Sequence, residues 1–116
     1  MKSIPVFFNN INRSAMVIIP KKPFKDWLLS IDQGAAHWDI TEDADVYLLP
    51  DFEEIEEAER WLEINFDLFF SDQLNNWYTA KKLWPKNRTF KMFKEWFDYS
   101  LHTMVWDILD DPIEKI

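Results

Sequence analysis

An aspartate and a histidine near the carboxyl end of the chain are the residue types of a general-base pair. Asp98 precedes His102 by four residues, so on a helix the two side chains share one face. A carboxylate beside an imidazole can orient the ring for proton transfer, and the same pair is also a common helical salt bridge. The chain has no Cys, and none of its serines is flanked by the glycines of a nucleophile elbow. We therefore predict a salt bridge without catalysis, and an enzyme that uses this pair is the third of three functional hypotheses.

Metal-binding patterns are weak in this sequence. The side chains that could ligate a metal include His37, His102, Asp98 and Asp107, but no His-x-x-x-His or Glu-x-x-His spacing occurs. The acidic segment 39–45 lacks the mid-loop glycine and the distal glutamate of a calcium loop. A single glycine in the whole chain excludes a glycine-rich phosphate loop. We predict neither a metal nor a cofactor.

Basic and aromatic residues alternate between positions 77 and 96. This combination is typical of sites for single-stranded nucleic acid or a phosphorylated ligand. The net charge of −8 argues against nucleic acid, and the bases can instead balance the thirteen carboxylates of residues 39–80. A binding module for a small anionic or nucleic-acid ligand is the second hypothesis. Its candidate residues are Arg13, Arg88, Trp84, Trp96, His102 and Asp98.

The glutamates of residues 53–59 are crowded at the start of an expected helix. Catalytic carboxylates need separated and differently tuned surroundings, whereas a cluster here suits a solvated face and the helix dipole. The leading hypothesis is a non-catalytic protein–protein interaction or adaptor protein, in which the acidic helix and exposed aromatic side chains contact another protein. Its candidate contact residues are Trp61, Trp77, Trp106, Glu53 and Glu56.

Two short apolar runs, residues 14–20 and 46–50, predict strands because each is bounded by polar residues and ends in proline. An N-terminal arm, residues 1–12, precedes them and offers residues 4–8 as a third strand. The remainder, residues 13–116, is predicted to form a single globular domain. The predicted class is α+β in the order β-α-β-α-α, with two or three short strands packed against two long amphipathic helices.

Apolar residues three and four positions apart predict the first two helices. Pro23 suits the first turn of one helix, and Gly34 is expected to stop it. Asp51 is the expected N-cap of the longer helix, with Glu54 completing a capping box. The expected buried residues are Phe24, Trp27, Leu28 and Ile31 of the first helix and Ile55, Ala58, Leu62, Phe66 and Phe69 of the second.

A third helix is predicted from an apolar stripe that runs from Phe90 to Ile108, about 30 Å of helix. Asn87 or Thr89 is its expected cap. A stripe of Phe, Leu and Met at this spacing is typical of a protein core. The stripe comprises Phe90, Phe93, Phe97, Leu101, Met104 and Ile108.

Six short stretches, most of them containing tryptophan or phenylalanine, resemble those of a small family of bacterial cytoplasmic proteins to which no activity is assigned. The resemblance covers residues 12–107 and implies a bacterial cytoplasmic protein without indicating a mechanism. The same location is favoured by residues 1–20, which lack a signal-peptide pattern, and by the absence of any apolar run near 20 residues. The stretches are NRSA (12–15), PFKDWL (23–28), VYLLP (46–50), WYTAKKLWP (77–85), RTFKMFKEWF (88–97) and HTMVWD (102–107).

Self-association as a homodimer is also predicted. Two apolar strands without charges leave open edges, and such edges tend to be paired or covered. Trp61, Trp84 and Trp106 fall off the helical stripes, and tryptophan is enriched at interfaces. An acidic helix and a basic segment on one chain suit a two-fold contact. Closure within one chain, with the arm over the sheet edge, is the alternative.

Overall fold

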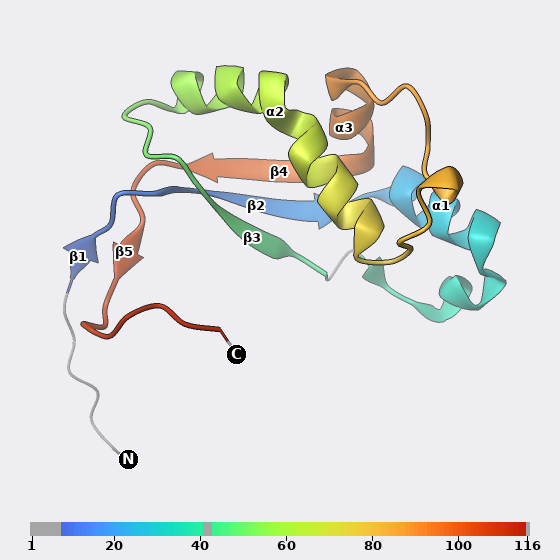
Figure 1. Ribbon diagram of the computed structural model, residues 1–116, viewed down its shortest axis with the longest axis horizontal. Helices are drawn as coiled ribbons and strands as arrows, with labels where there is room; N and C mark the ends of the chain where they lie inside the picture. The colour runs from blue at the N-terminus through green and yellow to red at the C-terminus, as the bar shows by residue number, and fades with distance from the viewer. Residues whose placement is uncertain (1–7, 41–42, 116) are drawn as a thin grey trace, which may run out of the picture.

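A three-stranded antiparallel sheet organises the part of the chain that the computed structural model describes, residues 8–40 and 43–115 (Figure 1). The predicted α+β class is confirmed, and a separate two-stranded ribbon pairs residues from the two ends of the chain. The elements are β1 (Asn9–Asn10), β2 (Ser14–Pro20), α1 (Lys22–Ile31), the 3₁₀ helix η1 (Gln33–His37), β3 (Asp45–Leu49), α2 (Ile55–Asn75), the 3₁₀ helix η3 (Lys81–Leu83), α3 (Phe90–Trp96), β4 (Phe97–His102) and β5 (Trp106–Asp107).

The central strand is β2, and the order across the sheet is β3-β2-β4. Ser14 lies opposite Leu49 of β3, and Ala15 lies opposite His102 of β4. The strand covers the whole predicted run, and β3 begins one residue earlier than predicted. Of the possible third strand in the arm, residues 4–7 lie outside the described residues, whereas Asn9 and Asn10 pair with β5.

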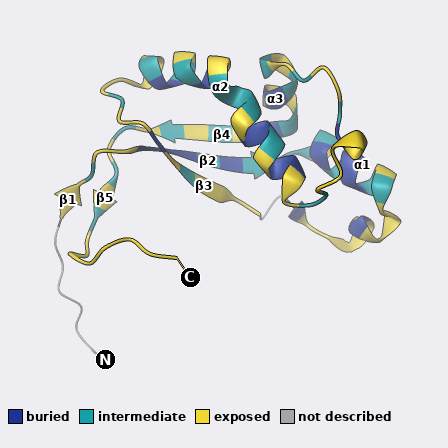
Figure 2. Cartoon of the chain, in the orientation of Figure 1, coloured by how far each residue is buried: buried dark blue, intermediate teal, exposed yellow. Residues whose placement is uncertain are grey.

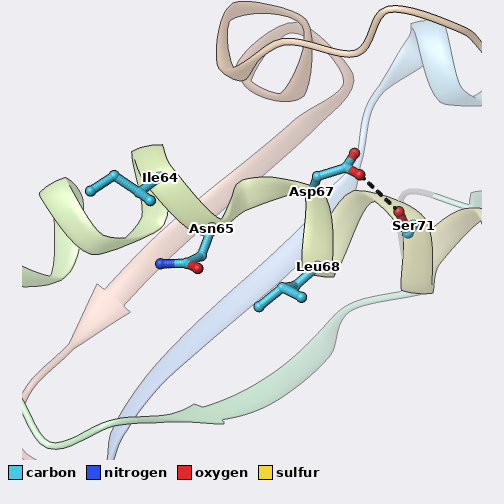
Figure 3. A pocket seen from close by; sticks show the side chains of 5 residues that line it. All are labelled: Ile64, Asn65, Asp67, Leu68 and Ser71. Atoms are coloured by element: carbon cyan, nitrogen blue, oxygen red, sulfur yellow. Dashed lines mark hydrogen bonds between the residues drawn. The ribbon is translucent and has the colours of Figure 1, made fainter.

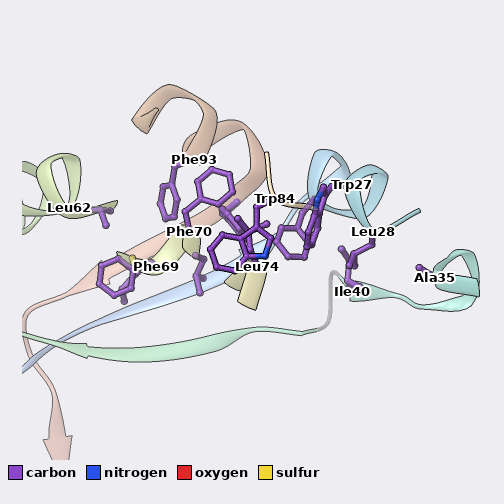
Figure 4. Packing of buried hydrophobic residues seen from close by; sticks show 14 of the residues in the cluster. Trp27, Leu28, Ala35, Ile40, Leu62, Phe69, Phe70, Leu74, Trp84 and Phe93 are labelled. Atoms are coloured by element: carbon purple, nitrogen blue, oxygen red, sulfur yellow. The ribbon is translucent and has the colours of Figure 1, made fainter. Parts of the chain in front are cut away.

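Helices α2 and α3 pack on one face of this sheet, and α1 packs against α3 beyond the end of β2 (Figure 1). Met16 and Ile18 of β2 are fully buried there, and Phe70 of α2 packs edge-on against Phe97 of β4 with ring centroids 5.3 Å apart. The core side chains of α2 and α3 lie between the helices and the strands (Figure 4), and the buried residues concentrate on these facing sides (Figure 2). The result is a two-layer domain with its core on one side of the sheet.

Helix α2 changes direction part-way along its length (Figure 1). Near the bend, Asn65 Nδ2 donates a hydrogen bond to the backbone oxygen of Trp61 at 2.9 Å. A side chain that bonds to the carbonyl four residues earlier competes with the helix ladder and bends it. The second half of α2 therefore crosses the sheet, and it buries Phe69, Phe70 and Leu74.

The prediction of one long final helix is wrong. Helix α3 ends at Trp96, and the next six residues form β4. The stretch from Phe97 to His102 also alternates apolar and polar residues, which is strand periodicity, and Phe97 satisfies both patterns. Residues 97–102 form a strand instead of a helix because they pair with the edge of β2 that faces away from β3. This pairing continues a contact at the end of β2, where Lys21 donates its backbone N–H to Trp96 O at 2.8 Å.

The predicted start of the second helix is also wrong. Helix α2 begins at Ile55, and the residue before it, Glu54, makes no capping bond through its side chain. Asp51 lies in the connection between β3 and α2, where the next residue, Phe52, donates its backbone N–H to Ser14 Oγ at 3.0 Å. Ile55 is exposed, while the later stripe residues are buried or partly buried.

The first helix agrees better with its predicted pattern. Phe24, Trp27 and Leu28 are buried as expected. The helix ends at Ile31, and Gly34 then lies in η1 without a left-handed backbone. The glycine is therefore not the left-handed stop that its position predicts.

Candidate functional site

One face of the three-stranded sheet carries side chains that are turned away from the core. Successive side chains of a strand point to opposite faces, and residues directly opposite each other on neighbouring strands share a face. The open face, as we call it, follows from this alternation and from the pairing register. It comprises Ala15, Val17 and Ile19 of β2, Val46 and Leu48 of β3, and Asp98, Ser100 and His102 of β4.

The open face holds the residues of the predicted general-base pair, but it separates them. Asp98 and His102 are four strand residues apart, which corresponds to about 13 Å. Asp98 Oδ1 lies 3.9 Å from Lys21 Nζ, and His102 Nε2 lies 2.9 Å from Ser100 Oγ. The predicted salt bridge between Asp98 and His102 is therefore wrong, because the helix that would join them is a strand.

The sequence analysis did not predict the contact between Ser100 and His102. The alternation of apolar and polar residues over 97–102 would have indicated it, because residues two positions apart on a strand share a face. A serine beside an imidazole is two-thirds of an acyl-transfer triad. Here Asp98 lies on the far side of Ser100, so it cannot orient the ring. Both side chains are exposed, so water reaches the contact freely. This geometry supports a polar surface better than a nucleophile.

Arg88 is committed to the acidic helix of its own chain. Its Nε donates to Asp67 Oδ1 at 2.7 Å, and its Nη2 donates to Asp67 Oδ2 at 3.1 Å. The guanidinium also lies 5.8 Å from the ring centres of Phe70 and Trp84. The hydrogen bonds from Arg88 are the main cause that holds the pKa of Asp67 below its ordinary value, outweighing partial burial. Asp67 and Ser71 line a depression of about 360 Å³ on α2 (Figure 3).

The tryptophans of the basic segment point mainly inward. Trp84 is buried in the core cluster and donates its indole N–H to Tyr78 O at 2.7 Å. Trp96 packs against Phe24, and Trp77 stacks on Trp38 with centroids 5.2 Å apart. The lysines are exposed on the outside. The three tryptophans are therefore engaged within the molecule, while Arg88 lies near the rings of Phe70 and Trp84 and Lys94 lies 4.9 Å from the ring centre of Phe90.

The remaining predicted contact residues are scattered. Trp61 is half-buried against Phe52 and Phe69, whereas Trp106 is exposed on β5. Arg13 is exposed and bonds to Asn12 through its guanidinium. Glu53 and Glu56 are exposed.

A polar cluster that the sequence did not reveal ties α2 to β3. Tyr47 Oη donates to Asp72 Oδ2 at 2.6 Å, and Gln73 Nε2 donates to Asp45 Oδ2 at 2.7 Å. Burial, and then the bond to Asp72, raise the pKa of Tyr47. On β4, burial and a bond to Glu59 raise the pKa of Tyr99 to about 12. Both tyrosines lie on the helix-covered face, so these contacts hold the two layers together.

Among the described residues, no cluster of three or more His, Asp or Glu side chains is placed to hold a metal ion. None of the helices in that part of the chain combines the length and the apolar character needed to cross a membrane. Comparison with protein families, with curated proteins and with solved structures found no match to this chain. The functional proposal therefore rests on the side chains that the structure exposes at its surface.

Proposed function

We propose that this protein is a non-catalytic protein-interaction module whose contact surface is the open face of the sheet. The observation that carries the proposal is the exposure of apolar side chains on an ordered strand. Val46 is 65% exposed and Leu48 is 49% exposed, although both belong to β3. Contiguous exposed apolar groups on a folded surface commonly mark a site of protein contact.

The composition of the open face supports the same reading. Val17 and Ile19, which are partly exposed, and the buried Ala15 form an apolar central column on β2, and the exposed Val46 and Leu48 extend it onto β3. The β4 column is polar and borders the apolar area on one side. An apolar centre with a polar rim is the usual anatomy of a protein interface.

Affinity capture with a matched control tests the proposal. The tagged full-length protein, Val46→Lys and Ile64→Lys are compared as baits in lysate of the native host. Ile64 is 80% exposed on α2, away from the sheet, so its lysine adds the same charge elsewhere. We expect Val46→Lys alone to lose proteins that the other two baits retain. Equal recovery by all three folded baits would exclude the open face as the contact surface.

A further inference from the structure

The open face is self-complementary, and we propose that it joins two copies of this chain in a face-to-face, two-fold homodimer. This inference rests on the proposed function and names the partner of the same surface. It differs from edge pairing, because the two sheets stack instead of extending each other.

The pairing register arranges the open face in three rows across the strands. The middle row is Val46, Val17 and Ser100. One outer row holds Leu48, Ala15 and His102, and the other holds Ile19 and Asp98. The negative charge and the imidazole of β4 thus lie at equal strand distances on either side of Ser100.

A two-fold axis along the middle row exchanges the outer rows. Asp98 then faces His102 of the second copy, and His102 faces Asp98 of the second copy, which gives two opposite-charge contacts when the imidazoles are protonated. Ile19 faces Ala15 of the second copy, so a large side chain meets a small one on each side of the axis. Charge and size therefore match in the same arrangement.

The other face-to-face symmetry is less favourable. An axis parallel to the strands stacks β3 of one copy on β4 of the other. Leu48 then covers His102 and Val46 covers Ser100, so polar side chains of β4 lie against aliphatic ones and Asp98 gains no opposite charge from the second copy. The axis along the middle row avoids this loss.

A hollow on the open face supports the same arrangement. It has a volume of about 150 Å³ and lies between β2 and β4. His102 of the second copy stands over this hollow when it faces Asp98. The residues that line it are Val17, Ile19, Asp98, Tyr99 and Ser100.

The size of the face sets the expected strength. Three strands about 4.8 Å apart and five to six residues long present a few hundred Å². This area is below the roughly 800 Å² per partner of a standard interface. Interfaces of this size are typical of weak or transient association, and we expect dissociation in the micromolar range, about 1–100 µM.

Sedimentation equilibrium of the full chain tests the dimer. The wild-type mass should rise from 14.1 kDa toward twice that value across micromolar concentrations. Val17→Lys places two lysines on the axis and should remain monomeric. Val46→Lys, on the exposed edge strand, is the second variant in case the central strand does not tolerate lysine. Ile64→Lys should associate like the wild type, and circular dichroism verifies each fold.

A charge exchange tests the position of the axis. His102→Asp sets carboxylates against each other in two places, and we expect it to raise the dissociation constant about tenfold at pH 6. The double variant Asp98→His with His102→Asp has the wild-type composition and restores both contacts. It should return the dissociation constant to within about threefold of the wild-type value.

Each result bears on the inference separately from the proposed function. A wild-type mass of 14.1 kDa at all concentrations overturns the homodimer, while loss of captured proteins by Val46→Lys would still support the open face. A dimer that persists in both Val17→Lys and Val46→Lys overturns the choice of face. Failure of the double variant to recover overturns the axis.

Discussion

The contacts of Arg88 in the structure differ from those that its place in the sequence predicts. As a base among tryptophans it was a ligand-binding candidate, yet its guanidinium is held by Asp67, twenty-one positions earlier in the chain. Its other contacts are the carbonyl of Pro85, the hydroxyl of Ser71 at 3.4 Å and two aromatic rings. The contact anchors the basic segment to α2, so we expect its loss to reduce stability.

Replacement of Asp67 by Asn should lower the free energy of unfolding by about 0.5–1.5 kcal/mol at pH 7. The range is modest because half of the Asp67 side chain is exposed, so solvent screens the pair. Urea denaturation measures the change. Asp26→Asn removes the exposed Lys22 pair and is the matched control, expected to cost less than about 0.5 kcal/mol.

The same pair predicts a pH dependence. The pKa of Asp67 is lowered in the folded state, so its stabilisation is complete above the ordinary value of 3.8 and declines as the pH falls through the lower folded value. The stability gap between wild type and Asp67→Asn should therefore narrow progressively as the pH falls below 3.8. A gap that stays constant as the pH falls well below 3.8 would assign the loss of stability to packing instead of charge.

Helix α3 has a true side-chain cap, whereas α2 has none. Thr89 Oγ1 accepts the backbone N–H of Met92 at 3.2 Å. Thr89→Ala should therefore destabilise the protein by about 0.5–2 kcal/mol, the usual cost of an N-cap. Asp51→Ala should change stability by less than about 0.5 kcal/mol, because Asp51 caps no helix here. A larger loss from Asp51→Ala than from Thr89→Ala in chemical denaturation would contradict both assignments.

Strand β4 follows α3 without an intervening loop, and this junction decides the architecture. Phe97 donates its backbone N–H to Phe93 O as the last helical bond and already lies opposite Pro20 of β2. Proline has no N–H to offer a neighbouring strand. The chain passes at this point directly from helix α3, which covers the sheet, into β4, which forms one edge of the sheet.

The whole domain depends on an aromatic core that lies on one side of its sheet. Phe70 is fully buried and contacts Phe93, Trp96 and Phe97. Phe70→Ala should cost about 3–5 kcal/mol, a large part of the roughly 5–15 kcal/mol that stabilises a domain. Leu68→Ala, two positions earlier but exposed, should cost less than about 1 kcal/mol. Similar thermal midpoints for the two variants would show that the core lies elsewhere.

Local pattern was sufficient for β2, α1 and the buried half of α2. In each of these segments one periodicity dominates, as in the continuous apolar run of β2 or the spacing of Phe24, Trp27 and Leu28. The α+β class follows from the same patterns. The predicted apolar stripe was also correctly assigned to the core as far as Leu101, whereas Met104 and Ile108 are exposed.

Contacts between distant parts of the chain decided the rest. Residues 97–102 fit both a helical and a strand pattern of apolar residues, and their hydrogen bonding to β2 decides in favour of the strand. Phe52 bonds to Ser14, which delays the start of α2, and Arg88 finds Asp67 instead of a ligand. The open face arose in the same way. Its three columns come from strands that are far apart in sequence, so their alignment depends on a register that is set only when the sheet forms.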